Sequence, residues 1–275
     1  MDISLATWSL QRLLRNTDTP INYLDVPALV RERFGVEALE LNNIFFASRD
    51  AAYLNQLKAA ADKAGTRLLN IAVDEQGDLS SADPASRDTG LKSYGAWIPI
   101  AADLGINAIR ANSGGRDVVD LPFGDPARTR AEDACIDSIR RLCDIGRKHG
   151  VAILVENHWG LSANPDSLAK VVAAVRESHG DKVCGTLVDW GNWPDSVDRW
   201  EALRKVFPYA MAVHAKVNDI DESLNHPRFD LGQALQITRE AGYDGYLGIE
   251  YEGKDDPMIG IDRGVRKLRA LLQQP

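Results

Sequence analysis

Four ionisable side chains stand near the ends of four successive apolar segments of the chain: Glu156, Asp189, His214 and Glu250. Alternate residues of a strand face the same way, so neighbouring parallel strands would bring these four groups together. Three carboxylates gathered at one place repel one another and raise one another's pKa, and a divalent cation would relieve that repulsion. Carboxylate and imidazole ligands suit Mn²⁺, Mg²⁺, Co²⁺ or Zn²⁺, so we predict one such ion held by the four residues.

An ion held in this way has a definite chemistry. It could polarise the carbonyl of a hydroxy-ketone while a neighbouring carboxylate removes a proton from the adjacent carbon, which gives an enediolate. Return of the proton to the neighbouring carbon is isomerisation, and return to the opposite face is epimerisation. Loss of a β-substituent is elimination. The first step is common to all three reactions, so the four ligands alone do not discriminate between them.

Two further ionisable residues follow these segments closely, and each has two interpretations. His158 lies two residues after Glu156 and could act as a second catalytic base or acid, or could orient a carboxylate through a hydrogen bond. Lys216 lies two residues after His214 and could stabilise an oxyanion or bind a substrate phosphate. Alternatively, Lys216 could form a salt bridge with Glu250 or Glu252.

Further polar and aromatic residues fall at the same ends of the predicted strands, and we expect substrate contacts among them. The polar candidates are Glu40, Arg110 and Asn112, and the aromatic candidates are Trp8, Trp159, Trp190 and Trp193. Flat rings with a polar edge suit the apolar face of a sugar, although the same tryptophans could simply fill the rim of the fold. For Glu40 and Arg110 the alternative is a structural role, as a buried pair with one another under the site.

Short apolar runs alternate with helix-period segments along the whole chain, and eight such units are counted. The candidate strands are Ile3–Ser9, Val36–Asn42, Arg67–Asp74, Asn107–Ser113, Val151–His158, Val183–Asp189, Ala212–Asn218 and Tyr246–Glu252. The candidate helices are Val26–Phe34, Asp50–Ala64, Arg87–Leu104, Ala127–His149, Asp166–His179, Asp195–Phe207, Leu231–Ala241 and Ile261–Gln273. Eight units and no G-x-G-x-x-G turn favour an α/β fold with one (β/α)8 TIM barrel, a single domain over residues 1–275.

The composition of the chain limits which partners the protein is expected to bind and where in the cell it is expected to lie. The chain has 275 residues and a formal net charge of −8, so we expect no nucleic-acid partner. Three cysteines without a C-x-x-C spacing predict reduced thiols and a cytoplasmic protein. No apolar run is long enough for a membrane span, and no signal peptide is expected. A homo-oligomer is possible, but the sequence identifies no interface.

The chain resembles the xylose isomerase-like TIM barrels, a group of sugar isomerases and epimerases. The matching pieces are GVEALELN, LVENHWG, TLVDWGNW, VHAK and GYDGYLGIEYEG, which run through nearly the whole chain. The resemblance implies that Glu156, Asp189, His214 and Glu250 bind the metal, and that the two glutamates also move protons. Asn192 stands where the keto-sugar epimerases of the group carry a histidine. The Arg and P-G-x-G segment expected after His214 is also missing.

These resemblances lead to three hypotheses about function. The first is a metal-dependent isomerase or epimerase of a small sugar or polyol-derived ketone. The second is a metal-dependent lyase or dehydratase acting on a keto-sugar, 3-keto-glycoside or keto-inositol, with His158 as base, since relatives that cleave 3-keto-glycosides carry a similar E-N-H segment. The third is a non-catalytic barrel that binds a sugar. The related DNA-repair endonucleases are a poor fit, because they use many histidines and this chain has five.

Overall fold

The computed structural model describes residues 1–75 and 77–274. Its strands form one closed barrel in chain order, which confirms the α/β barrel predicted from the sequence. The strands are β1 (Asp2–Ala6), β2 (Ala38–Asn42), β3 (Arg67–Ala72), β4 (Ala108–Ala111), β5 (Ala152–Glu156), β6 (Cys184–Asp189), β7 (Ala210–Lys216) and β8 (Tyr246–Glu250). The chain divides into two compact units, residues 71–212 and residues 1–70 with 213–275.

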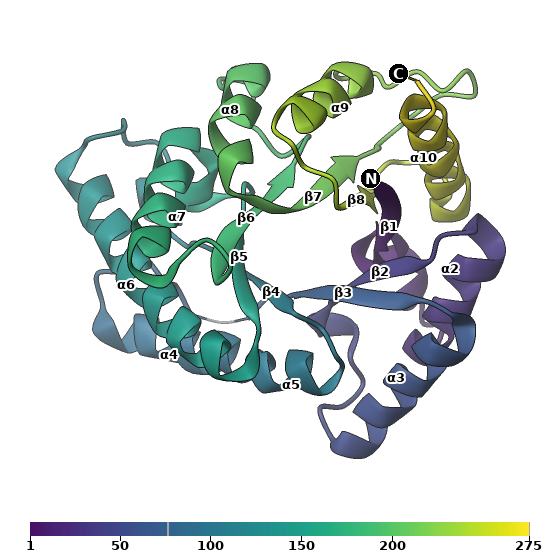
Figure 1. Cartoon of the computed structure of the whole chain (residues 1–275), viewed down its shortest axis with the longest axis horizontal. Coiled ribbons are helices and arrows are strands. Elements are labelled where there is room, and N and C mark those ends of the chain that lie inside the picture. The colour runs from purple at the N-terminus through teal and green to yellow at the C-terminus, as the bar shows by residue number, and fades with distance from the viewer. Residues whose placement is uncertain (76, 275) are drawn as a thin grey trace. The chain divides into compact units, whose positions relative to one another are not determined.

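The unit of residues 71–212 contains the parallel strands β4, β5 and β6, with helices packed outside them (Figure 1). Its helices are α4 (Pro84–Gly95), α5 (Trp97–Asp103), α6 (Pro126–His149), α7 (Pro165–His179) and α8 (Arg199–Val206). Side chains of Ala108, Ala152, Leu154 and Leu187 form a buried apolar cluster. Small and branched residues therefore occupy the early positions of these strands, and polar residues are left for the strand ends.

The other unit pairs β1 with β2 and with β8, and β8 with β7, all in parallel. Its helices are α1 (Gln11–Leu14), α2 (Val26–Phe34), α3 (Ala51–Ala64), α9 (Leu231–Glu240) and α10 (Pro257–Leu272). Helix α2 has the predicted bounds. Asp230 and Asp256 cap α9 and α10 by accepting hydrogen bonds from backbone N–H groups of the first turn, which is why these helices begin there.

Several strands end earlier than the sequence pattern predicts. Strand β5 ends at Glu156 and β8 at Glu250, two residues short in each case. The physical reason is that backbone N–H groups at these ends donate to side-chain amides and not to the backbone carbonyls of a neighbouring strand. Asn157 accepts a hydrogen bond from the Asp189 N–H at 2.7 Å, and Asn218 accepts one from the Glu252 N–H at 2.6 Å.

The helix predicted over Arg87–Leu104 is in fact two helices, α4 and α5, which meet at Ala96. Pro99 explains the break, because proline has no N–H to donate to the carbonyl of Gly95. Helix α3 ends as predicted, with Gly65 in the left-handed conformation at φ 66°. Among the described helices, none is both long and apolar enough to cross a membrane.

Candidate metal centre

The four predicted ligands all lie at or near the carboxyl ends of their strands. Glu156, Asp189 and Glu250 are the last residues of β5, β6 and β8, and His214 is two residues before the end of β7. All four are buried, with exposed fractions of 3%, 0%, 8% and 3% for Glu156, Asp189, Glu250 and His214. In a barrel of parallel strands this is the end that carries the active site.

A buried guanidinium holds Glu156. The Nε atom of Arg110 lies 3.1 Å from Glu156 Oε2, and Arg110 Nη1 donates to Asp74 Oδ1 at 2.8 Å. Asn112 donates to the same Asp74 oxygen at 3.0 Å. Burial raises the pKa of Asp74, but the Arg110 charge and these hydrogen bonds outweigh it and lower the pKa. Burial lowers the pKa of Arg110, and the charges of Asp74 and Glu156 reverse this and raise it.

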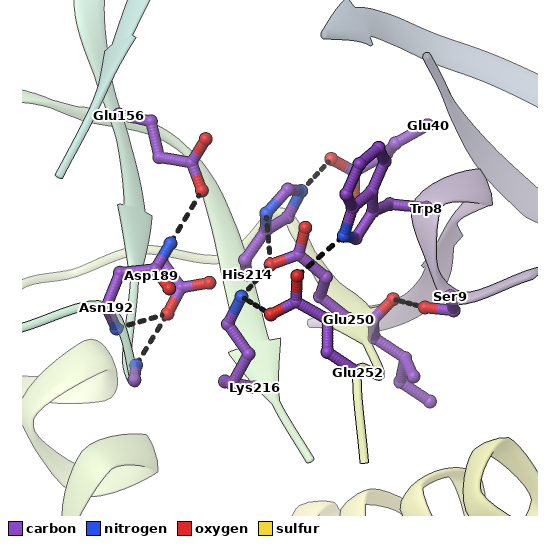
Figure 2. Close-up of polar contacts among 12 residues, drawn as sticks. Trp8, Ser9, Glu40, Glu156, Asp189, Asn192, His214, Lys216, Glu250 and Glu252 are labelled. Atoms are coloured by element: carbon purple, nitrogen blue, oxygen red, sulfur yellow. Dashed lines mark hydrogen bonds and ion pairs between the residues drawn. The ribbon is translucent and has the colours of Figure 1, made fainter. Parts of the chain in front are cut away.

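Two backbone N–H groups hold one oxygen of the Asp189 carboxylate. Gly191 N and Asn192 N donate to Asp189 Oδ1 at 2.6 and 2.9 Å (Figure 2). The side chain of Asn192 then donates to Glu156 Oε1 at 3.2 Å. Asn192 therefore links two predicted ligands from one short turn after β6. At the position where the resemblance implies a histidine, the chain thus has Asn192, whose side-chain amide binds Glu156.

His214 is fixed by a carboxylate on each side. Its Nε2 atom lies 3.0 Å from Glu40 Oε2, and its Nδ1 atom lies 3.7 Å from Glu250 Oε2. Ser4 Oγ donates to Glu40 Oε1 at 2.6 Å, and Asn70 Nδ2 donates to Glu40 Oε2 at 2.7 Å. Glu40 thus has its own partners, and Arg110 bonds Asp74 and Glu156, so the prediction that Glu40 and Arg110 pair with one another is wrong. Contact of Glu40 with substrate stays a prediction.

Lys216 forms salt bridges with Glu250 and Glu252, which is one of the two roles predicted for it from the sequence. Its Nζ atom pairs with Glu250 Oε2 and lies 2.9 Å from Glu252 Oε2. Trp8 Nε1 donates to the other Glu252 oxygen at 2.6 Å (Figure 2). Burial raises the pKa of Glu250, but the charges and hydrogen bonds of Lys216 and His214 dominate and hold that pKa well below its usual range.

The remaining predicted residues differ in exposure. His158 is exposed and lies beyond the end of β5, so the prediction that this strand runs to His158 is wrong. Trp159 is half-buried, with the guanidinium carbon of Arg116 3.9 Å from its ring centre. Trp190 and Trp193 are 0% and 3% exposed, and this burial fits the alternative that they fill the rim. Roles in substrate binding and catalysis stay predictions for all these residues.

Sequence reasoning missed four residues that support the centre: Ser4, Asn70, Asp74 and Asn157. Ser4 and Asn70 lie on β1 and β3, and each contacts Glu40 across more than 29 positions of sequence. Their polarity inside otherwise apolar strand segments was the available signal. Buried polar groups are almost always hydrogen-bonded, so such a residue indicates a partner even where the partner cannot be named.

The donor set fits a divalent cation. Three buried carboxylates carry more negative charge than a protein interior tolerates without cations close by, and Arg110 and Lys216 each contact one of them. Oxygen ligands with one imidazole suit hard to borderline ions, whereas the three cysteines are buried and free. A buried Glu/Asp/His group of this kind could bind a metal ion.

Comparison with solved structures shows the same fold. A 3-keto-D-glucoside 4-epimerase from E. coli aligns with a TM-score of 0.75 at 15% identity, over 100% of both chains. A D-psicose 3-epimerase from Clostridium cellulolyticum H10, solved with D-tagatose, aligns with a TM-score of 0.73 at 17% identity, also over 100% of both chains. A barrel protein from Mycobacterium smegmatis in complex with magnesium aligns with a TM-score of 0.69 at 18% identity, over 98% of this chain and 97% of the other.

Similarity in sequence is more local. The C-glycoside deglycosidase alpha subunit of Arthrobacter globiformis is 42% identical over 48 residues, which is 18% of this chain and 14% of that protein. The chain thus matches a small part of that relative's length. A family model covers far more, because residues 29–271 match the xylose isomerase-like TIM barrel. The chain belongs to the xylose isomerase-like TIM barrel family.

Proposed function

We propose that this protein is a divalent-metal-dependent isomerase or epimerase of a small sugar or polyol-derived ketone. One observation carries the proposal: Glu156, Asp189, His214 and Glu250 are all buried, and each offers a ligand atom of a kind that could hold a metal ion. We propose further that both units act as one catalytic domain on a carbohydrate substrate. A homo-oligomer and a cytoplasmic location stay predictions.

The two glutamates are proposed to move the proton. A bound divalent cation would polarise the ketone and stabilise negative charge on its oxygen. Glu156 and Glu250 would then serve as base and acid, because each ends a different strand and each is fixed by its own cation, Arg110 or Lys216. General acid–base catalysis of this kind contributes about 10²- to 10⁴-fold in rate. An epimerase needs two such groups, one on each face of the reacting carbon.

Two of the structures with the same fold carry sugar-epimerase names, a 3-keto-D-glucoside 4-epimerase and a D-psicose 3-epimerase. One fold hosts many activities, so these names support the choice of reaction class without identifying the substrate. The magnesium complex among the relatives supports a divalent ion in the same way.

Elimination from a 3-keto-glycoside is the second candidate, and two observations favour it. The 48-residue match is to a C-glycoside deglycosidase subunit. His158 is exposed beyond the end of β5, two residues after Glu156. An accessible imidazole near the predicted metal ligands could remove the proton that elimination requires. A sugar-binding barrel without activity is the third hypothesis.

The test begins with metal content. We expect about one divalent ion per chain in protein purified without chelator, and little in Asp189→Asn. Asp244→Asn is the matched control, since it makes the same change at an exposed position just before β8. The absence of metal in the wild-type protein, even after incubation with Mn²⁺, Mg²⁺, Co²⁺ and Zn²⁺, would contradict both enzyme hypotheses.

The second stage separates the reactions. The metal-loaded protein would be incubated in D₂O with D-fructose, D-tagatose and a 3-keto-glucoside carrying a nitrophenyl aglycone. Deuterium in the recovered ketose, with a new epimer or aldose, supports the first candidate. Release of nitrophenol supports elimination. Unchanged substrates together with saturable sugar binding would favour the non-catalytic barrel.

A further inference from the structure

We propose that Glu40 is a positioning residue that sets the tautomer of His214, keeping the proton on Nε2 so that Nδ1 presents its lone pair to the metal. The proposal rests on the proposed function, in which His214 is a metal ligand. All of the contacts that carry it lie within the unit of residues 1–70 and 213–275.

The direction of the Glu40–His214 hydrogen bond follows from the other partners of Glu40. Ser4 Oγ donates to Oε1 at 2.6 Å, and Asn70 Nδ2 donates to Oε2 at 2.7 Å. An ionised carboxylate can only accept hydrogen bonds. His214 Nε2 lies 3.0 Å from Oε2, so Nε2 must be the donor and carry the proton.

A proton on Nε2 decides the role of the other ring nitrogen. In a neutral imidazole one nitrogen donates and the other has a free lone pair, so Nδ1 becomes the ligand atom. Nδ1 also faces the metal side of the ring, since it lies 3.7 Å from Glu250 Oε2. His214 and Glu40 are both 3% exposed, so water does not compete for the hydrogen bond between them.

Gly248 on β8 leaves the space for this pair. It stands opposite His214 in the β7–β8 register. A Cβ atom at Gly248 would come within 2.1 Å of Glu40 Oε1 and 2.9 Å of His214 Cδ2. A side chain at this position would therefore push the carboxylate away from the imidazole. The carboxylate–imidazole contact depends on a residue without a side chain.

The tautomer can be read directly in the metal-free protein by long-range ¹H–¹⁵N NMR of its five histidines. The His214 signals are those lost in His214→Gln. We expect Nε2 to carry a proton. An Nε2 atom without a proton would overturn the proposal without any variant of Glu40 having to fold.

Variants of Glu40 test the consequence for Zn²⁺ affinity, measured by competition with a chromophoric chelator. Glu40→Gln should keep the Nε2 proton, because its amide oxygen can take the place of Oε2 while Ser4 turns to accept from the amide NH₂. Glu40→Leu removes the acceptor, and we expect a mixture of tautomers and a 10- to 100-fold weaker affinity, the range found for such supporting residues. Glu37→Gln is the charge-matched control, since that residue is 68% exposed and pairs with Arg31.

Failure of this proposal is distinguishable from failure of the proposed function. If wild-type protein binds none of Mn²⁺, Mg²⁺, Co²⁺ and Zn²⁺, the metal-dependent function fails, while the proton on Nε2 in the metal-free protein still tests Glu40. If wild-type protein binds Zn²⁺ and folded Glu40→Leu binds it equally well with an unchanged tautomer, the positioning role fails and the metal centre stands.

Discussion

The Nε atom of Arg110 lies 3.1 Å from Glu156 Oε2, with the Arg110 side chain 5% and the Glu156 side chain 3% exposed. A fixed cation of the protein therefore neutralises this carboxylate away from water. The same guanidinium bonds Asp74 through Nη1. Two carboxylates thus depend on one buried cation, and the consequences of removing it can be measured.

We expect Arg110→Met to lower the free energy of unfolding by about 3–5 kcal/mol, because it leaves the buried Glu156 carboxylate and the half-buried Asp74 carboxylate without their partner. Arg110→Lys should recover part of this, since it restores the charge but not the planar fork. Urea unfolding followed by circular dichroism measures the effect. Arg31→Met is the control, because its ion pair with Glu37 is largely exposed and should change stability little. Equal losses for Arg110→Met and Arg31→Met would contradict the prediction.

The Lys216–Glu250 pair predicts a pH dependence of stability. Lys216 and His214 outweigh burial and hold the folded pKa of Glu250 well below its usual range. A lowered folded pKa stabilises the protein fully above the unfolded pKa, about 4.3 for glutamate, and this contribution is lost as the pH falls through the folded value. Lys216→Met should therefore unfold more easily than wild type at pH 6–7, and the gap should shrink below about pH 4.3.

Urea unfolding of both proteins between pH 3 and pH 7 checks this pH dependence. Contributions from other carboxylates, such as Asp74, cancel in the difference between the two proteins. A difference in unfolding free energy that stays constant over this range would show that Lys216 stabilises the fold by some means other than the charge of Glu250.

A variant of Asn192 tests whether this residue only orients Glu156 or is also needed for metal binding. Asn192→Ala removes the 3.2 Å bond to Glu156 Oε1 but keeps the backbone N–H that holds Asp189. We therefore expect metal content to stay at the wild-type level and kcat to fall about 10-fold, the lower end of the range for residues that support metal ligands. Asn192→Asp should be worse, because it places a like charge beside Glu156. Loss of metal in Asn192→Ala would mean that the amide does more than orient Glu156.

The sequence predicts the order of the strands and the strand ends that carry Glu156, Asp189 and Glu250. These three residues could be placed because residues on the inward face of a strand recur with a period of two. For several strands the last residue could not be predicted. At the ends of β5 and β8, the side chains of Asn157 and Asn218 accept hydrogen bonds that replace the backbone hydrogen bonds between strands. A single sequence shows that these residues are polar. It does not show which backbone group each will meet.

The supporting network around His214 could not be predicted for a similar reason. Ser4 and Asn70 reach Glu40 from strands 36 and 30 positions away in the chain. Periodicity assigns each of them to a strand. The pairing arises from the stagger of three different strands, and local sequence carries no signal for that stagger.

Two of the tryptophans predicted to contact substrate should behave differently when shortened. Trp190 is 0% exposed, so Trp190→Ala should cost about 3–5 kcal/mol of stability. Trp8 is half-buried and donates to Glu252, so Trp8→Phe should cost about 1.5–3 kcal/mol at most. Thermal unfolding of both variants beside wild type checks the order. A larger loss for Trp8→Phe than for Trp190→Ala would contradict the burial seen here.

Gly248 supplies the last prediction. Gly248→Ala should displace Glu40 from His214, since the new Cβ would meet Glu40 Oε1 at 2.1 Å and this carboxylate is tied to Ser4 and Asn70. We expect a lower melting temperature and a weaker Zn²⁺ affinity, because the imidazole loses its partner. Gly232→Ala is the matched control in the first turn of α9, where the nearest contact is the flexible Asp230 side chain at 3.1 Å. In the double variant Gly248→Ala/Glu40→Ala the clash with Glu40 is removed and the 2.9 Å contact with His214 Cδ2 remains, so stability should recover in part while Zn²⁺ affinity stays low. Recovery of both properties would show that Glu40 contributes nothing to the metal centre.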